Sequence, residues 1–380
     1  MARSSAEIDG GRVLLVVGHA AGGMGAHVVG LARGLPSHGW AASVLTSDVT
    51  ARHFNLGEQV IVGWPQRGAG LIGRLRATRR LLAGHDVVHA HGHQAGLLAV
   101  VVAATLSGRR RPPVAVSWHN AVLGGGPRRR LLAAAERLQA RRADLLTGAS
   151  ADMVERARAL GARDPELAEV AAVDVHRPGG PDRDHVRAAV LAEFGTGPDT
   201  RLVLTVARIA PQKNLEMLID AAALLGHRVP GVVWLVAGAG DAGAIRRLEE
   251  RVRAAGAPVR LIGTRGDVPR LLAAADAFAL SSDWEARALA VQEAMAAGTA
   301  VAATAVGGVP ELLGDSGLLV TPGDPAALAA AVERLLTDLG LAKDLASRAR
   351  ERYAELPTED DVVAGWARRY ARLRHGRRSA

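Results

Sequence analysis

Short runs of apolar, β-branched residues alternate with longer amphipathic stretches along most of the chain, and this alternation restricts its fold more than any other feature. Apolar runs of about four to eight residues are typical of strands buried on both faces, and the amphipathic stretches between them are typical of helices that cover a sheet. Repeated strand–helix units of this kind predict an α/β fold with doubly wound parallel sheets.

The predicted elements form two series of similar size. In the first series we expect strands at residues 12–17, 42–46, 87–91, 113–118, 145–148 and 170–173, and helices at 27–37, 71–83, 94–106, 128–143 and 151–160. In the second series we expect strands at 201–206, 232–237, 259–262, 277–280, 300–303 and 317–320, and helices at 215–225, 244–255, 267–274, 290–297 and 325–336. A final helix is expected at 360–373.

These series and a length of 380 residues predict two Rossmann-like domains. Residues 177–183 contain two prolines and two glycines, which are typical of a linker. We therefore expect a first domain at residues 1–180, a linker at 181–198 and a second domain at 199–357. Ligands of such sheets bind beyond the carboxyl ends of the strands, so the residues at those ends matter most for function.

The composition excludes several kinds of site. The chain has no Cys, which excludes disulfides, thiolate nucleophiles and Cys-based metal sites. The longest apolar run, at residues 95–106, is shorter than the roughly 20 residues that cross a bilayer, so we expect a cytoplasmic protein.

Positive charge is concentrated in the first half of the chain. Residues 67–142 hold 14 Arg or Lys residues against 2 Asp or Glu residues, within a net charge of +9 for the whole chain. The arginines flank leucines in two predicted helices, a pattern that fits either contact with an anionic membrane or ordinary solvated helices. No aromatic residues interleave with these arginines for base stacking, so we expect no nucleic-acid partner.

Two glycine-rich loops join a strand to a helix. Gly22 and Gly23 follow the first strand, where backbone amides can approach an anion. Gly238, Gly240 and Gly243 form a literal G-x-G-x-x-G, and Arg265 after the next strand would suit a 2′-phosphate. Because this second loop follows the second strand of its domain, an NADP-dependent dehydrogenase is kept only as an alternative.

Charged residues follow two strands of the second domain. Arg208 and Lys213 precede a helix, where a forked guanidinium, an ammonium group and the helix amides together suit a diphosphate. Glu285 precedes the helix at 290–297, and Glu293 lies about two turns further along the same side. A carboxylate there can accept hydrogen bonds from sugar hydroxyls, and Glu293 needs a partner because its neighbours are apolar. Solvated surface pairs are the ordinary alternative for both sets.

Together these residues resemble the retaining GT-B glycosyltransferases of family 4. In the second domain the resemblance rests on Arg208 with Lys213, on Glu285-x7-Glu293 followed by Ala-Met-Ala-Ala-Gly, and on Val306-Gly-Gly-Val-Pro-Glu311. In the first domain it rests on the Gly22-Gly23 loop, Asp86-Val-Val-His-Ala-His91 and Ser117-Trp-His119-Asn120, so that it covers most of residues 12–338.

The resemblance implies a GT-B architecture, with two Rossmann-like domains facing across a cleft and a final helix within residues 358–380 that packs back on the first domain. It also implies an enzyme that moves a sugar from a nucleotide-diphospho donor to an acceptor hydroxyl, with retention of configuration and without a metal or other cofactor. Cations would stabilise the departing diphosphate in such a reaction. The sequence has no acidic cluster of the D-x-D kind where a donor-bound metal would be expected.

The family's residue roles transfer to matching positions. Arg208 and Lys213 would hold the donor diphosphate, Glu293 the nucleotide ribose and Glu285 the transferred sugar. His91 would lie beside the donor sugar as a further catalytic residue, His119 on the acceptor side, and His89 would be structural. The remaining donor-binding residues would be Gly22, Gly23, Thr264, Arg265 and Leu289.

One departure from the family pattern follows Glu285. Ala286-Arg287-Ala288-Leu289 replaces the common Gly-Phe-Gly, and a cation at Arg287 points to an acidic or phosphorylated group nearby. The sugar, the nucleotide (UDP, GDP or ADP) and the acceptor stay open, including a lipid-linked or phosphorylated acceptor at the inner membrane face. The same fold is also compatible with a sugar-nucleotide epimerase and with an inactive sugar-nucleotide sensor.

Overall fold

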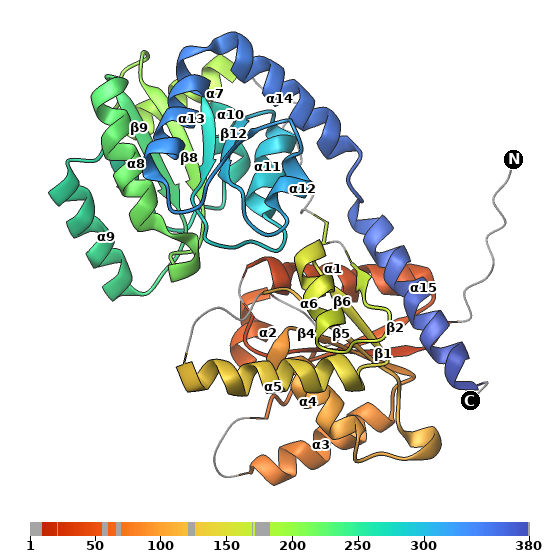
Figure 1. Cartoon of the computed structure of the whole chain (residues 1–380). Coiled ribbons are helices and arrows are strands. Elements are labelled where there is room, and N and C mark those ends of the chain that lie inside the picture. Colours follow the sequence, from red (N-terminus) through yellow and green to blue (C-terminus); the bar gives the residue numbers. More distant parts are fainter. Residues whose placement is uncertain are drawn as a thin grey trace, which may run out of the picture. The chain divides into compact units, whose positions relative to one another are not determined.

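The chain forms two compact units in a computed structural model that describes residues 10–20, 22–54, 60–65, 70–120, 126–168, 170–171 and 183–378 (Figure 1). The first unit contains residues 1–171 and 357–380, and the second contains residues 172–356. Each unit has its own parallel sheet and its own buried apolar core. In the described part of the chain, no helix combines the length and apolarity that crossing a bilayer requires.

A seven-stranded sheet in the order β3-β2-β1-β4-β5-β6-β7 forms the centre of the first unit. Helices cover both faces, so the central strands are buried almost throughout and their sequences are mostly apolar, with His89 and His91 in β4 and Ser117 in β5 as buried polar exceptions. The strands are β1 (Arg12–Val17), β2 (Ala41–Thr46), β3 (Val60–Val62), β4 (Val87–His91), β5 (Val114–Trp118), β6 (Leu145–Gly148) and β7 (Glu166–Leu167). The helices are α1 (Gly23–Gly34), α2 (Asp48–Phe54), α3 (Leu71–Ala83), α4 (His93–Ala103), α5 (Gly126–Arg142), α6 (Ala151–Ala159) and α15 (Glu359–Arg378), with the 3-10 helices η1 (Leu35–His38) and η3 (Gly108–Arg110).

The C-terminal helix α15 belongs to the core of the first unit (Figure 1). Trp366 and Tyr370 are fully buried, and the Tyr370 ring meets Trp40 edge to face with centroids 5.3 Å apart. A Cβ atom at Gly34 of α1 would lie 2.8 Å from the Val363 side chain, so a small residue lets the two helices approach. This packing confirms the expectation that the final helix returns to the first domain.

A six-stranded sheet in the order β10-β9-β8-β11-β12-β13 forms the centre of the second unit. Successive residues of β8 point to opposite faces, so Val203 lies in one apolar cluster and Leu204 in the other. The strands are β8 (Arg201–Val206), β9 (Val232–Ala237), β10 (Val259–Leu261), β11 (Ala277–Leu280), β12 (Ala300–Thr304) and β13 (Leu318–Val320). The helices are α7 (Arg183–Glu193), α8 (Leu215–Arg228), α9 (Ala242–Ala255), α10 (Val268–Ala274), α11 (Leu289–Ala297), α12 (Val309–Leu313), α13 (Pro325–Thr337) and α14 (Leu339–Ala354), with the 3-10 helix η4 (Pro211–Lys213).

The structure differs from the sequence-based prediction in several places. It contains strands β3 and β7 and helices α2, α12 and α14, which the sequence analysis did not predict. The strand expected at residues 170–173 is wrong at 170 and 171, which are not in a strand, and residues 172–173 lie outside the described part. The linker expected at 181–198 contains helix α7, which belongs to the second unit. Arg187 fixes this helix, because its guanidinium donates to the carbonyl oxygens of Ala274 and Thr200 and pairs with Asp276 at 2.9 Å.

Candidate functional site

The segment after β8 is supported by the glycine-rich loop after β9. Parallel pairing continues past both strands, since the amide of Ile209 donates to the carbonyl oxygen of Ala239 at 2.8 Å. A Cβ atom at Gly238 would lie 1.9 Å from the carbonyl oxygen of Ala207, so only glycine permits this approach. Arg208 lies within this segment and is exposed, and no described residue forms an ion pair with it. The contacts therefore present a guanidinium at the carboxyl end of β8.

Lys213 and Glu285 form an ion pair at the carboxyl edge of the second sheet. Both follow neighbouring strands, β8 and β11, and both side chains are largely buried, with 18% and 8% of their surface exposed. The hydroxyl of Ser282 donates to the same carboxylate oxygen at 2.6 Å. The hydroxyl of Ser281 donates to the carbonyl oxygen of Lys213 at 2.8 Å, so the loop after β11 also holds the backbone of η4. Two residues that are 72 positions apart thus share one polar cluster.

The glycine pair after β12 positions Glu285. The amide of Gly308 donates to the carbonyl oxygen of Glu285 at 3.0 Å. Gly307 has a φ angle of 51°, and a Cβ atom there would lie 1.8 Å from the same oxygen. The Val-Gly-Gly-Val-Pro-Glu segment identified in the sequence therefore supports the backbone of the acidic residue.

Glu293 lies in α11 of the same unit and is half-buried, in a helix whose residues Val291, Ala294 and Met295 are buried and apolar. Burial raises the pKa of its carboxyl group above the ordinary value. None of the described residues donates a hydrogen bond to this carboxylate. A group of this kind is costly unless a ligand or a proton satisfies it. Leu289, predicted to contact the donor, is the first residue of the same helix.

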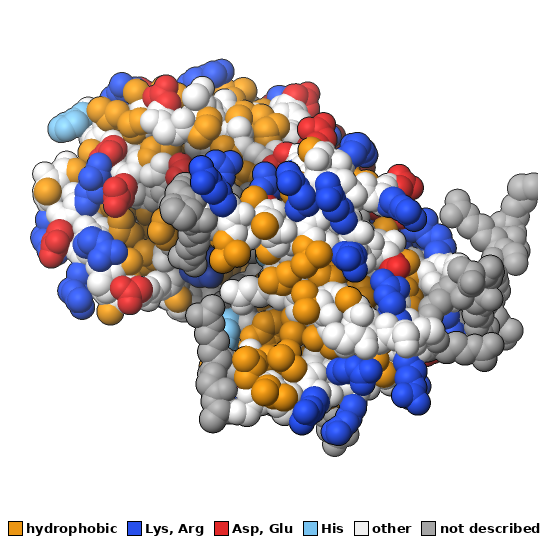
Figure 2. Space-filling model, turned by 60° about the horizontal axis from the view of Figure 1, so that its bottom comes forward, with side chains coloured by type: hydrophobic (Ala, Val, Ile, Leu, Met, Phe, Trp, Pro, Cys, Tyr) orange, Lys and Arg blue, Asp and Glu red, His pale blue; other side chains and the backbone are white. Residues whose placement is uncertain are grey.

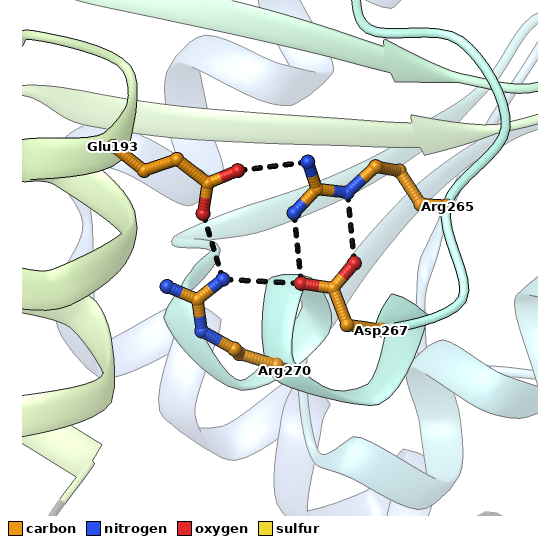
Figure 3. Close-up of polar contacts among 4 residues, drawn as sticks. All are labelled: Glu193, Arg265, Asp267 and Arg270. Atoms are coloured by element: carbon orange, nitrogen blue, oxygen red, sulfur yellow. Dashed lines mark hydrogen bonds and ion pairs between the residues drawn. The ribbon is translucent and has the colours of Figure 1, made fainter.

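The side chain of Arg265 lies in a network of ion pairs with Glu193, Asp267 and Arg270 (Figure 3). Its guanidinium contacts Glu193 at 2.7 Å and both oxygens of Asp267 at 2.8 Å. Hydrogen bonds from Arg265 lower the pKa of Asp267 to about 2. Because these carboxylates already hold the Arg265 guanidinium, this side chain is less available to a ligand than the backbone of residues 264–265. Thr264 itself is exposed.

The G-x-G-x-x-G loop is built differently from a dinucleotide-binding loop. The carboxylate of Asp241 accepts hydrogen bonds from the amides of Gly243 at 2.9 Å and Ala244 at 3.2 Å. It therefore occupies the N-terminus of α9, which is where a pyrophosphate would bind. Together with the ion-paired Arg265, this capping counts against the NADP-dependent alternative.

Four histidines gather in the first unit. His91 ends β4, His119 follows β5, and their Nδ1 and Nε2 atoms lie 3.2 Å apart. His27 of α1 completes a triangle, since its ring centroid lies 5.5 Å from that of His91 and 5.4 Å from that of His119. His89 is fully buried, with Nδ1 2.7 Å from the Tyr370 hydroxyl and Nε2 2.8 Å from the Ser117 hydroxyl, which is the structural role expected of it.

Burial makes these histidines poor bases. Burial, followed by the neighbouring His119 ring, lowers the pKa of His27 to about 3. Burial and the His93 ring lower the pKa of His119 to about 4, and burial with the His89 ring lowers the pKa of His91 well below its ordinary value. All three imidazoles are therefore neutral at pH 7.

The loop before α1 offers backbone donors. Gly22 has a φ angle of 77° and precedes Gly23, the first residue of the helix. The N-cap residue Gly22 has no side chain and forms no capping hydrogen bond, so it leaves the amides of the first turn available to donate to a ligand. Among the described residues, the predicted site residues thus form two groups, one in each unit. Sequence reasoning missed Ser282 and His27; the one available signal for His27 was a polar ring in an otherwise apolar helix.

Solved structures share the architecture of this chain. The chain superposes on Anabaena HepE in complex with UDP and glucose with a TM-score of 0.79 and 21% identity, covering 94% of this chain and 99% of that one. It superposes on WaaG, a glycosyltransferase of lipopolysaccharide biosynthesis, with a TM-score of 0.71 and 18% identity, covering 93% and 98%. Two parallel sheets with flanking helices and these neighbours define a two-domain α/β GT-B fold, as predicted.

Sequence comparison gives the family. Residues 200–338 match the family of glycosyl transferases group 1, and residues 22–173 match the glycosyl transferase 4-like domain. A D-inositol 3-phosphate glycosyltransferase of Salinispora arenicola is 32% identical over 77% of this chain and 70% of its own length. One of Jonesia denitrificans is 29% identical over 93% and 92%. The chain therefore belongs to the group 1, family 4 glycosyltransferases and is a glycosyltransferase.

Proposed function

We propose that this enzyme transfers a sugar from a nucleoside-diphosphate donor to an acceptor hydroxyl, with retention of configuration and without a catalytic metal. The observation that carries the proposal is the buried ion pair between Lys213 and Glu285, which lie in the loops after β8 and β11. The exposed guanidinium of Arg208 precedes Lys213 by five residues in the same loop. Two cations beside a carboxylate offer one surface to a diphosphate and another to a hydroxylated sugar. Structures of HepE with UDP and with UDP-glucose support a nucleotide sugar as the donor.

Each predicted site residue of the second unit has a part in this proposal. The ammonium group of Lys213 has three N–H donors, so it can hold Glu285 and a phosphate oxygen at the same time. Arg208 would take the second phosphate in a forked hydrogen bond. Glu293, which lacks a donor among the described residues, would accept the ribose hydroxyls, and Glu285 would accept hydroxyls of the transferred sugar. Thr264 and Arg265 would meet the base through their backbone.

The chemical step is leaving-group departure. As the sugar–phosphate bond breaks, negative charge grows on the diphosphate, and preorganised cations stabilise that charge more than they stabilise the ground state. The acceptor hydroxyl would then attack the face that the diphosphate has left, and the phosphate would take its proton. His91 and the Gly22-Gly23 amides would contact the donor, and His119 the acceptor.

The acceptor is proposed to carry phosphate. The relatives named D-inositol 3-phosphate glycosyltransferase support a phosphorylated polyol. A relative named for lipopolysaccharide core synthesis supports a lipid-linked glycan instead. Exposed arginines on α3 accompany Ile72, which is 67% exposed, and Leu131 of α5 is 73% exposed. Figure 2, which brings forward the part that carries α3 in Figure 1, shows basic and hydrophobic side chains next to each other. Such a surface suits anionic lipid headgroups at the cytoplasmic face of a membrane.

A thermal-shift screen with UDP-, GDP- and ADP-sugars tests the donor directly. A ligand at about 100 times its Kd stabilises the folded state by about 2.7 kcal/mol, so the correct donor raises Tm by several degrees. Lys213→Ala and Glu293→Ala should lose both this shift and transfer, while circular dichroism stays unchanged. Transfer that survives in both variants would overturn the proposal.

Product analysis separates the remaining activities. The anomeric coupling constant of the product reports retention, and transfer in the presence of EDTA reports metal independence. Consumption of the donor without any acceptor would identify an epimerase. Binding without turnover across phosphorylated and lipid-linked acceptors would identify a sensor.

A further inference from the structure

Three imidazoles of the first unit converge on one point. One ring nitrogen from each of His27, His91 and His119 lies within 4.8 Å of the other two. The three residues come from separate parts of the fold: His91 ends β4, His119 follows the adjacent strand β5, and His27 lies in α1. The fold, and not local sequence, therefore brings these groups together.

The separations fit ligands of a single metal ion. Tetrahedral zinc with bonds of about 2.0–2.1 Å to nitrogen places its ligand atoms about 3.3 Å from each other. The Nδ1 atom of His91 and the Nε2 atom of His119 are 3.2 Å apart. The ring nitrogen of His27 lies at most 4.8 Å from the other two ligand nitrogens. Rotations about side-chain bonds that move it by up to roughly 1.5 Å would bring it to the tetrahedral distance.

The hydrogen bonding of His91 leaves one ring nitrogen without a partner. Its side chain is only 2% exposed, Nδ1 faces His119, and Nε2 is buried with no hydrogen-bond partner among the described residues. A neutral imidazole has one N–H and one lone pair. When Nδ1 binds the cation, the single N–H of this neutral ring lies on Nε2, so Nδ1 keeps its lone pair for the metal.

We propose that His27, His91 and His119 bind one divalent transition-metal ion, with Zn²⁺ as the best fit and a fourth position left for water or an anion. Neutral imidazole nitrogen is a preferred ligand of Zn²⁺, whereas Mg²⁺ and Ca²⁺ prefer oxygen. The three histidines belong to the first unit, whereas Arg208 and Lys213, to which the proposed function assigns the leaving-group chemistry, belong to the second. The proposed function also places His91 beside the donor and His119 beside the acceptor, so a bound ion would compete with those contacts.

Metal binding to the full chain tests this proposal without any sugar donor. Protein without a polyhistidine tag is freed of metal with EDTA, desalted, and titrated with ZnCl₂ by calorimetry. We expect one Zn²⁺ per chain and no heat of binding with MgCl₂. Titration with CoCl₂ should give the intense visible bands of tetrahedral Co²⁺, which octahedral Co²⁺ in water lacks.

Variants tie the binding to the cluster. His119→Ala and His27→Asn should each weaken Zn²⁺ binding by at least about tenfold, because each removes a direct ligand. His53→Ala removes an exposed imidazole of the same unit and should leave binding unchanged. His119 is only half-buried, so His119→Ala decides the outcome if His27→Asn does not fold. Absence of stoichiometric binding in the wild type, or equal affinity in His119→Ala and the wild type, would refute the site.

Discussion

Replacement of Lys213 by Met tests how the buried ion pair contributes to stability. The substitution keeps the length and apolar stem of the side chain but removes the charge. Among the described residues, the Glu285 carboxylate, 8% exposed, would then keep only the hydroxyl of Ser282 as a partner. Removal of one member of a buried pair costs about 3–5 kcal/mol, and because the Lys213 side chain is 18% exposed we expect a value near the lower end, about 3 kcal/mol.

A double-mutant cycle separates the interaction from the two side chains. Glu285→Gln should cost about 1–2 kcal/mol, less than Lys213→Met, because the longer side chain of Lys213 can extend its ammonium group toward water. The double variant leaves no uncompensated charge, so it should cost less than the sum, with a coupling energy of about 2 kcal/mol. In a domain of this size, about 3 kcal/mol corresponds to a fall in Tm of about 6–12 °C.

Urea unfolding, followed by far-ultraviolet circular dichroism and by tryptophan fluorescence, measures these values. Trp234 and Trp284 report on the second unit, and the two probes are compared because two units need not unfold together. Lys343→Met is the matched control: Lys343 is the other lysine of the chain, is exposed, and should change stability by less than about 0.5 kcal/mol. If Lys213→Met also costs less than about 1 kcal/mol, or if the two single costs simply add, the pair is not a buried interaction and the reasoning fails.

Three further substitutions test the surroundings of the site. Glu293→Gln should raise Tm at pH 7 and abolish the donor-induced shift. Burial raises the pKa of this carboxyl, so its ionisation opposes folding; the gain in Tm should vanish as the pH falls below the ordinary value of 4.5 in a pH series of melting curves. Asp267→Asn should cost about 1 kcal/mol at pH 7, since the network is partly exposed, and the cost should disappear as the wild-type Asp267 itself becomes protonated between pH 3.8 and about 2. Gly307→Ala should cost about 1–3 kcal/mol and reduce transfer, because its Cβ would meet the carbonyl oxygen of Glu285 at 1.8 Å. Gly323→Ala, where φ is 78° with open space around the Cβ, should show the backbone strain alone and keep full activity.

Strands were the most predictable elements, for a physical reason. Both faces of each parallel sheet are covered, so β1 and β8 are nearly uninterrupted apolar runs whose limits can be read directly. Helix α7 was missed because prolines and glycines precede it and its stability comes from distant groups. Its buried residues, Val190 and Leu191, join a core that forms only when the second unit folds.

In the candidate site, too, some residues could be predicted from their position in the sequence, whereas the roles of others depend on tertiary contacts. Lys213 and Glu285 could be proposed as site residues because each lies in the loop after a buried strand, and neighbouring parallel strands end at one edge. The role of Ser282, whose hydroxyl holds the Glu285 carboxylate, depends on a turn geometry that the sequence does not specify. The contact of His27 with His91 depends on how α1 crosses the sheet, which no local pattern encodes.

A glycine in a loop of the second unit can either contact a ligand through its own backbone or let the backbone of a neighbouring residue approach. Gly238 is part of a literal G-x-G-x-x-G and Gly307 is part of the Val306–Glu311 motif, yet each is required because a Cβ atom would strike a backbone carbonyl of this chain, that of Ala207 or that of Glu285. Both contacts lie beside a charged residue of the proposed donor site, one adjoining Arg208 and the other holding Glu285. The glycines therefore act through the backbone to position side chains that bind ligand, whereas in a dinucleotide fingerprint they would meet the ligand themselves. Substitution of either glycine should therefore alter stability and displace these side chains at the same time. A loss of nucleotide affinity without any change in stability is not expected.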